Sequence, residues 1–196
     1  MPRTNSILRY VAFLRGINVG GHRVKMDRLR DLFTALEFSN VATFIASGNV
    51  TFEAPASDAT GIEKRIEAHL EQSLGYEVDT FLRTPADLAS IVAFRPFACE
   101  DVQVPGHTLH VAFLRDALGG EAERKMRSFS TERDNFRVHG RELYWLCRGK
   151  FTDSMVNWRL VTKAVTMRST MRNMTMLRKL AAMVLPEPSS QRKRKV

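Results

Sequence analysis

The stretch Tyr10-Val-Ala-Phe-Leu-Arg-Gly-Ile-Asn-Val-Gly-Gly21 decides how this chain folds, because a short apolar strand runs directly into a glycine loop. Its first half recurs one hundred positions later as His110-Val-Ala-Phe-Leu-Arg115, with five of the six residues identical. A motif that returns at a fixed interval indicates one folding unit copied in tandem. We therefore predict an internal duplication within these 196 residues.

The residues around this stretch predict the elements of the first copy. Apolar side chains on both faces of the segment 8–15 indicate a central strand, and apolar residues at helical spacing indicate the helices. Gly75 is typical of a helix C-terminus and Pro85 of a first helical turn. The expected elements are a strand at 8–15, a helix at 25–37, a hairpin of strands at 41–46 and 49–52, a helix carrying 62–74, a strand at 76–83 and a short helix at 84–94.

The same order returns after a linker at 95–106 that contains Pro and Gly. The expected elements of the second copy are a strand at 108–114, a helix at 119–129, a hairpin of strands at 136–138 and 142–147, a helix at 151–165, a strand at 166–169 and a helix at 172–184. Each copy reads β-α-β-β-α-β plus a helix, which is the ferredoxin-like arrangement, or α/β plait, of an α+β protein.

The predicted organisation is a first ferredoxin-like half at 1–94, a second half at 107–185 and a disordered basic tail at 186–196. The first strand of each copy is apolar on both sides, so the face that the helices leave open should also be buried. We expect the two copies to pack on each other or to share sheets.

Positive charge gathers toward the C-terminus of a chain whose formal net charge is +9. Residues 1–98 hold eleven basic and eleven acidic side chains, whereas residues 148–196 hold twelve basic side chains against Asp153 and Glu187. Such an end can hold phosphate groups of nucleic acid, and a solvated helix face with a charged tail is the competing interpretation. The nucleic-acid alternative would use Arg148, Lys150, Arg168, Arg172, Arg178 and Lys179.

Several classes of protein are disfavoured by the composition. No apolar run reaches the roughly 18 residues of a membrane span, and the N-terminus lacks a signal-peptide core, so we expect a cytoplasmic protein. Cys99 and Cys147 form no Cys-x-x-Cys pair and are expected to be buried thiols. The five histidines are scattered, so we expect neither a metal nor a cofactor. No nucleophile, base and orienting group fall into a known pattern, which assigns no catalytic residue and leaves an enzymatic activity open.

The strand order predicts that two glycine turns lie together, because strands one and three of this topology are neighbours. The loop at 16–21 has the glycine spacing of a phosphate loop, but His22-Arg23 stand where that motif has Lys and Ser or Thr. The backbone of a glycine loop that leads into a helix can still hold an anion, with Arg15, His22, Arg23 or Lys25 adding charge. The competing interpretation is that these glycines only permit a tight turn. For a small anionic or nucleotide ligand, the expected contacts are Arg15, Asn18, Gly20, Gly21, Lys25, Ser47 and Asn49.

The motifs also point to a family. Arg15-Gly-Ile-Asn-Val-Gly-Gly21, then Lys25-Met26, then Ser47-Gly-Asn-Val50, and finally Arg172-Asn173 closely resemble a bacterial family known as domain of unknown function 1697. The resemblance covers nearly the whole chain and implies a pair of ferredoxin-like halves, but no activity, substrate or catalytic residue.

The chain departs from the family pattern at three positions. Phe44 and Ala46 stand where the family has Tyr and Gln, and Met174 stands where it has an aromatic residue. Any role of those three family side chains is therefore not carried over.

Overall fold

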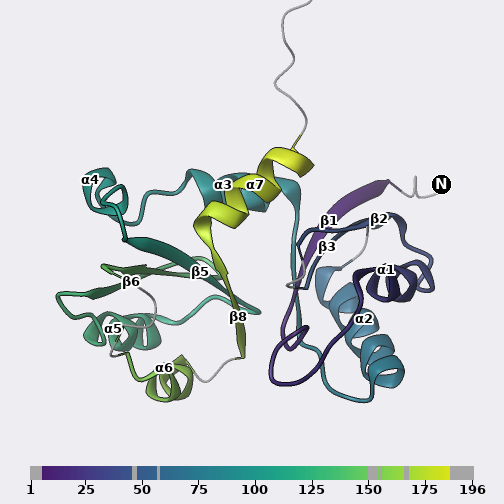
Figure 1. Ribbon diagram of the computed structural model, residues 1–196, viewed down its shortest axis with the longest axis horizontal. Helices are drawn as coiled ribbons and strands as arrows, with labels where there is room; N and C mark the ends of the chain where they lie inside the picture. Colours follow the sequence, from purple (N-terminus) through teal and green to yellow (C-terminus); the bar gives the residue numbers. More distant parts are fainter. Residues whose placement is uncertain are drawn as a thin grey trace, which may run out of the picture.

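Two four-stranded antiparallel sheets carry the fold, one in each half of the chain (Figure 1). The computed structural model describes residues 6–45, 48–56, 58–149, 154, 156–165 and 168–185. The first half comprises β1 (Ile7–Leu14), α1 (Met26–Thr34), β2 (Ser39–Thr43), β3 (Asn49–Pro55), α2 (Ala59–Leu74), β4 (Thr80–Arg83) and α3 (Pro85–Ala93). The linker at 95–106 contains a short helix, α4 (Cys99–Val102). The second half comprises β5 (Thr108–Leu114), α5 (Gly120–Ser128), β6 (Asp134–His139), β7 (Glu142–Cys147), α6 (Trp158–Val165), β8 (Ser169–Asn173) and α7 (Met174–Val184).

Both halves have the same strand order. The first sheet runs β2-β3-β1-β4 and the second runs β6-β7-β5-β8. The central strands β1 and β5 each pair with a hairpin strand on one side and with the last strand of their half on the other. This architecture confirms the predicted α+β fold of two tandem ferredoxin-like halves.

Residues at the helix ends fix the bounds of α2 and α3. Asp58 caps α2 by accepting a hydrogen bond from the Gly61 N–H at 3.1 Å, and α2 ends at Gly75, whose φ is 80°. Thr84 and Asp87 form a reciprocal capping box at the start of α3. Within the described ranges, no helix has both the length and the apolar character needed to cross a membrane.

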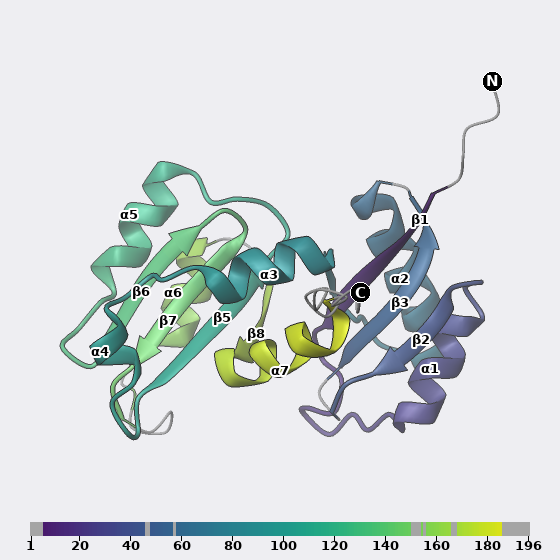
Figure 2. The same ribbon diagram turned by 90° about the horizontal axis from the view of Figure 1, so that it is seen from above.

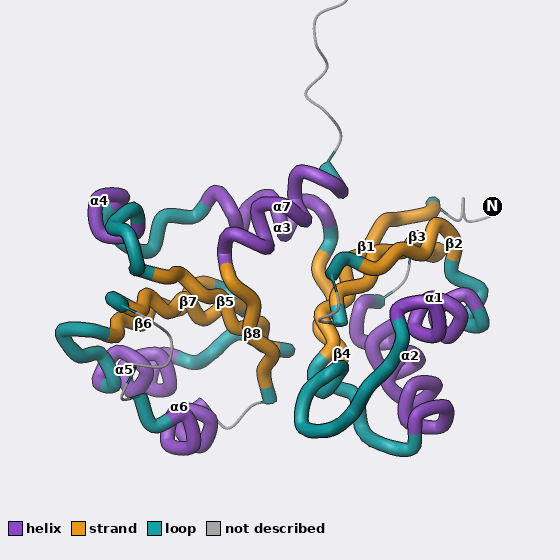
Figure 3. The backbone as a smooth tube through the Cα atoms, viewed as in Figure 1, coloured by secondary structure: helices purple, strands orange, loops and turns teal. Residues whose placement is uncertain are grey.

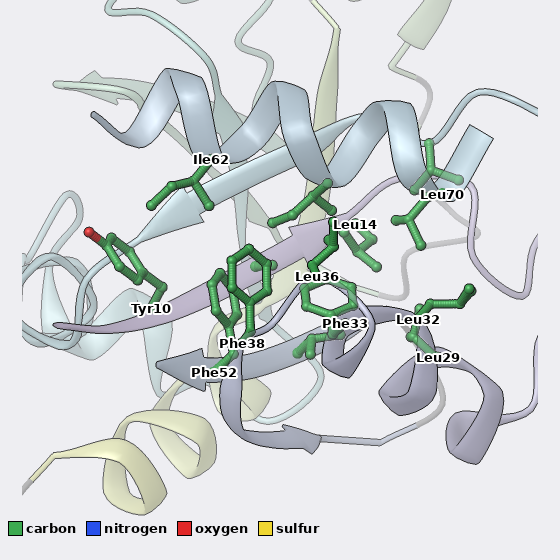
Figure 4. Close-up of a cluster of buried hydrophobic side chains, with 14 of the residues drawn as sticks. Tyr10, Leu14, Leu29, Leu32, Phe33, Leu36, Phe38, Phe52, Ile62 and Leu70 are labelled. Carbon is green, nitrogen blue, oxygen red and sulfur yellow. The ribbon is translucent and has the colours of Figure 1, made fainter. Parts of the chain in front are cut away.

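Each sheet has an outer core beneath its own pair of helices. In the first half, α1 and α2 cover the outer face, and Phe33, Phe38 and Phe52 pack there with the aliphatic residues drawn in Figure 4. In the second half, α5 and α6 cover a cluster that includes Phe136 and Trp145. The Trp145 indole donates to Asp134 Oδ1 at 2.8 Å, so this buried polar group is paired.

A third core lies between the two sheets, where α3 and α7 are also packed (Figure 2). It joins Val11 and Phe13 of β1 to Val111 and Phe113 of β5, and the rings of Phe13 and Phe113 stack with centroids 4.0 Å apart. Strand β4 is at one edge of the first sheet and β8 is at one edge of the second, and these two edges face each other (Figure 3). The halves therefore pack together, as expected from the apolar first strands, and each keeps its own sheet.

Some expected boundaries were wrong in the second half. The last strand spans Ser169–Asn173, so its expected end at 169 was wrong, and its expected start at 166–167 lies outside the described residues. Helix α6 begins at Trp158, and the expected start at 151 also lies outside the described residues. Arg172 looks like the start of a helix, but its backbone pairs with Val111 in the sheet. The expected burial of both thiols holds for Cys147 and fails for Cys99, which is exposed in the linker between the halves. The predicted tail at 186–196 lies outside the described residues.

Replacing Gly48 with Ala should destabilise the fold by about 2 kcal/mol or more, because the residue has a positive φ of 68°. A Cβ there would also approach Ile17 Cβ to 3.0 Å and the Leu14 carbonyl oxygen to 3.2 Å. The measurement is urea unfolding. Gly61→Ala is the matched control, because its Cβ would meet only Asp58 at 3.9 Å, and it should be neutral or stabilising by up to about 1 kcal/mol. Equal losses in both variants would contradict the turn geometry.

Candidate functional site

The structure brings the glycine loop at 16–21 and the β2–β3 hairpin side by side. The Leu14 N–H donates to the Gly48 carbonyl at 2.8 Å, and the Arg15 N–H donates to the Asp79 carbonyl at 2.9 Å. The start of the loop is therefore fixed on one side by the hairpin and on the other by the segment that enters β4.

The loop and the hairpin contain a cluster of residues with positive φ. Asn18 has a φ of 57°, Gly20 of 60° and Gly21 of 91°, and in the hairpin Ile45 has a φ of 48°. A β-branched residue is rare in this region, and such strained backbone gathers at functional sites. Nothing lies within 4 Å of the Cβ positions of Gly20 and Gly21, so the backbone of this loop is open to an approaching ligand.

The loop leads to a helix start that no side chain caps. Lys25 occupies the N-cap of α1 and makes no capping hydrogen bond there. The first N–H groups of a helix have no partner within the helix and favour anions. Arg23, Lys25 and Arg28 are exposed at this end, and none of them makes an ion pair with any residue that the structure describes. Asp27, in the same turn, is paired with Arg30.

The predicted contacts divide between the surface and the interior. Gly20, Gly21 and Lys25 are exposed. Asn18 accepts a hydrogen bond from the Val24 N–H at 2.8 Å, which closes the loop, and Arg15 pairs with Asp79 at 3.0 Å.

Two further predicted contacts belong to the hairpin. Asn49 is fully buried, where its amide nitrogen donates to the Phe44 carbonyl at 3.0 Å, and Ser47 lies outside the described residues. Arg28 was not among the expected contacts, although its place in the first turn after Lys25 is a sequence signal that could have found it.

A buried guanidinium ties the loop and the hairpin to the far end of the chain. Arg172 donates from Nη2 to the Leu14 carbonyl at 2.8 Å and from Nε to Asn49 Oδ1 at 2.6 Å. Its carbon Cζ lies 5.8 Å from the ring centre of Phe13. Burial lowers the pKa of Arg172 to about 10, so the side chain stays charged at neutral pH. Arg172 therefore joins the C-terminal motif to the stretch 10–21 and to the hairpin motif 47–50.

The other half holds an equivalent guanidinium. Arg83 lies opposite Val11 in the sheet, as Arg172 lies opposite Val111. Its Nη2 donates to the carbonyl of Leu114 at 3.0 Å and to that of Arg141 at 3.1 Å, while its Nε donates to Glu142 Oε1 at 2.6 Å. Burial lowers the pKa of Arg83, and the Glu142 carboxylate acts in the opposite direction. Each half therefore inserts one arginine into the other.

The remaining residues of the nucleic-acid alternative differ in environment. Arg148 is paired with Asp101, and Arg168 contacts Glu77 at 2.6 Å and Asp79 at 3.1 Å. Arg178 and Lys179 are exposed on α7, and Lys150 lies outside the described residues. Arg172 is buried, and Arg148 and Arg168 are paired, so among the described residues of this set the exposed cations without an ion pair are those on α7. The alternative stays a prediction.

The described residues contain no group of three His, Cys, Asp or Glu side chains that could hold a metal ion. The candidate site at the loop consists of backbone N–H groups and cationic side chains.

Comparisons with other proteins agree with the fold. Residues 7–144 match the family model described as a protein of unknown function (DUF1697). No curated protein matches the chain. Among solved structures, the chain is similar to a conserved bacterial protein from Streptococcus pneumoniae, with a TM-score of 0.72 and 19% identity. The alignment covers 91% of this chain and 99% of that one, and at this identity it shows the fold alone.

Replacing Arg83 with Met should destabilise the protein by about 3 kcal/mol, because it leaves the Glu142 carboxylate buried without its cation. Adding Glu142→Leu should recover part of that loss, giving a coupling free energy of about 1.5 kcal/mol or more in a double-mutant cycle read by urea unfolding. The exposed pair of Arg127 and Glu123 is the control, and its coupling should stay below about 0.5 kcal/mol. Similar coupling in the two pairs would contradict a structural role for the Arg83 contact.

Proposed function

We propose that this chain, which belongs to the DUF1697 family of proteins of unknown function, binds a small phosphate-bearing anion at its glycine loop. The observation that carries the proposal is the start of α1, where no side chain caps the helix and Arg23, Lys25 and Arg28 are exposed. A helix N-terminus carries about half an elementary positive charge and directs N–H groups outward. Charge and hydrogen-bond donors therefore act on the same ligand.

The glycines allow the ligand to come close to the backbone. Gly20 and Gly21 leave open space where other residues carry Cβ, so phosphate oxygens can approach their N–H groups. In this proposal Asn18 shapes the loop and Asn49 holds the hairpin, and the charge on the ligand is balanced by Arg23, Lys25 and Arg28.

A nucleotide is the ligand class that fits the neighbouring side chains. His22 is exposed, and its ring stacks on Tyr76 with centroids 3.8 Å apart. This stacked pair offers a flat surface directly after the loop, on which a base can lie while its phosphate is held at α1. Inorganic phosphate lacks the base and should bind more weakly than a nucleoside monophosphate.

The proposal predicts that Lys25→Gln/Arg28→Gln weakens binding of AMP about 5-fold or more at low salt, because each lost charge contributes about 0.3–1 kcal/mol at a helix N-terminus. Isothermal titration calorimetry with AMP, adenosine and inorganic phosphate measures the effect. Affinity for AMP and phosphate should fall as salt is added, while adenosine should respond little.

The matched control is Lys64→Gln/Arg124→Gln, which removes the same charge from exposed positions on α2 and α5. It should change the AMP affinity by less than about 2-fold, the size expected of screened charges far from the ligand. Equal losses in the two double variants would show that AMP responds only to net charge, and the loop site would be abandoned.

A further inference from the structure

A pocket lies between the linker that joins the halves and the inner face of the second half. It has a volume of about 160 Å³, and its lining includes Phe94, Pro96, Phe97, Val102 and Leu109. Arg178 of α7 and the linker residue Cys99 also line it. None of these residues belongs to the glycine loop, so the site is independent of the proposed function.

The walls of this pocket are held in place by contacts behind them. The Phe94 ring stacks on His139 with centroids 4.1 Å apart, and Arg137 lies 5.7 Å from the ring centre of Phe97. The short helix α4 is anchored by Asp101, which accepts from Arg148 Nε at 2.8 Å. A preformed pocket saves a ligand the entropy cost of ordering the protein around it.

The charge at the pocket is positive. Arg95 and Arg178 line it, and no carboxylate does so among the residues that the structure describes. Arg95 donates to the Val92 and Ala93 carbonyls at 3.0 Å each. It thereby satisfies carbonyl groups at the C-terminal end of α3. Arg178 is exposed, and within the described ranges it makes no ion pair. It is therefore available to a bound anion.

The volume of the pocket limits the size of the apolar group that a ligand can place inside it. A dry cavity of about 150 Å³ accommodates one benzene ring in other proteins. From this volume, the apolar walls and the available cation, we infer that the pocket binds a small apolar carboxylate, with a single aryl ring or short acyl chain inside and the carboxylate paired with Arg178.

The two cysteines make the inference testable in the intact protein. Cys99 is exposed and lines the pocket, whereas Cys147 is fully buried, so a neutral alkylating reagent should modify Cys99 selectively. Phenylacetate is the probe, and phenylacetamide is its uncharged match. The measurement is the rate at which iodoacetamide modifies Cys99, followed by mass spectrometry and normalised to the ligand-free rate of each variant.

Phenylacetate at about ten times its Kd should slow the modification about tenfold, and phenylacetamide at the same concentration should protect several-fold less. Arg178→Gln should remove the difference between the two probes. Lys179→Gln, which removes the neighbouring exposed charge on α7, should keep it. Lys25→Gln/Arg28→Gln should also keep it, which separates this pocket from the glycine loop.

Saturation-transfer NMR on phenylacetate, with the same variants, gives a second readout that does not depend on the thiol. Transfer in the wild type that is lost in Arg178→Gln supports the inference. Absence of both protection and transfer overturns it, and so does equal protection by the acid and the amide.

Discussion

The rest of this structure depends on two buried arginines, each of which extends from its own half of the chain into the other half. Arg83 and Arg172 each reach past the inner core to the carbonyl at the end of the other half's central strand. A buried guanidinium is costly unless its N–H groups find acceptors, and a buried carbonyl oxygen is costly unless it accepts a hydrogen bond. Both requirements are met in the register in which the halves are docked, which is also the register that stacks Phe13 on Phe113.

The same contacts connect the fold to the candidate sites. Arg172 holds the last carbonyl of β1 and the side chain of Asn49, so the entry to the glycine loop is fixed by a residue more than 120 positions away. On the other side of the inner core, Tyr144 and His139 of the second half support the Phe94 ring that lines the linker pocket. Docking of the halves thus shapes both places where ligands are proposed to bind.

The two proposed sites rely on different physical chemistry. The glycine loop offers an open backbone and exposed cations, so binding there is governed by electrostatics and weakens with salt. The linker pocket offers a fixed apolar volume with one available cation, so size and shape select the ligand and charge adds discrimination.

The sequence by itself determined most of the elements and their order, because glycine stops, proline in a first turn and apolar periodicity act over a few residues. Gly75 and Pro85 mark helix ends that the structure has at those residues. It also determined the two ferredoxin-like halves, since the strand and helix pattern is repeated. Only the tertiary structure decided that Arg172 is buried, that Asn49 supports a hairpin and that Cys99 lies in a pocket. The environment of a polar side chain depends on partners that are far away in the sequence. The pattern of neighbouring residues does not identify those partners.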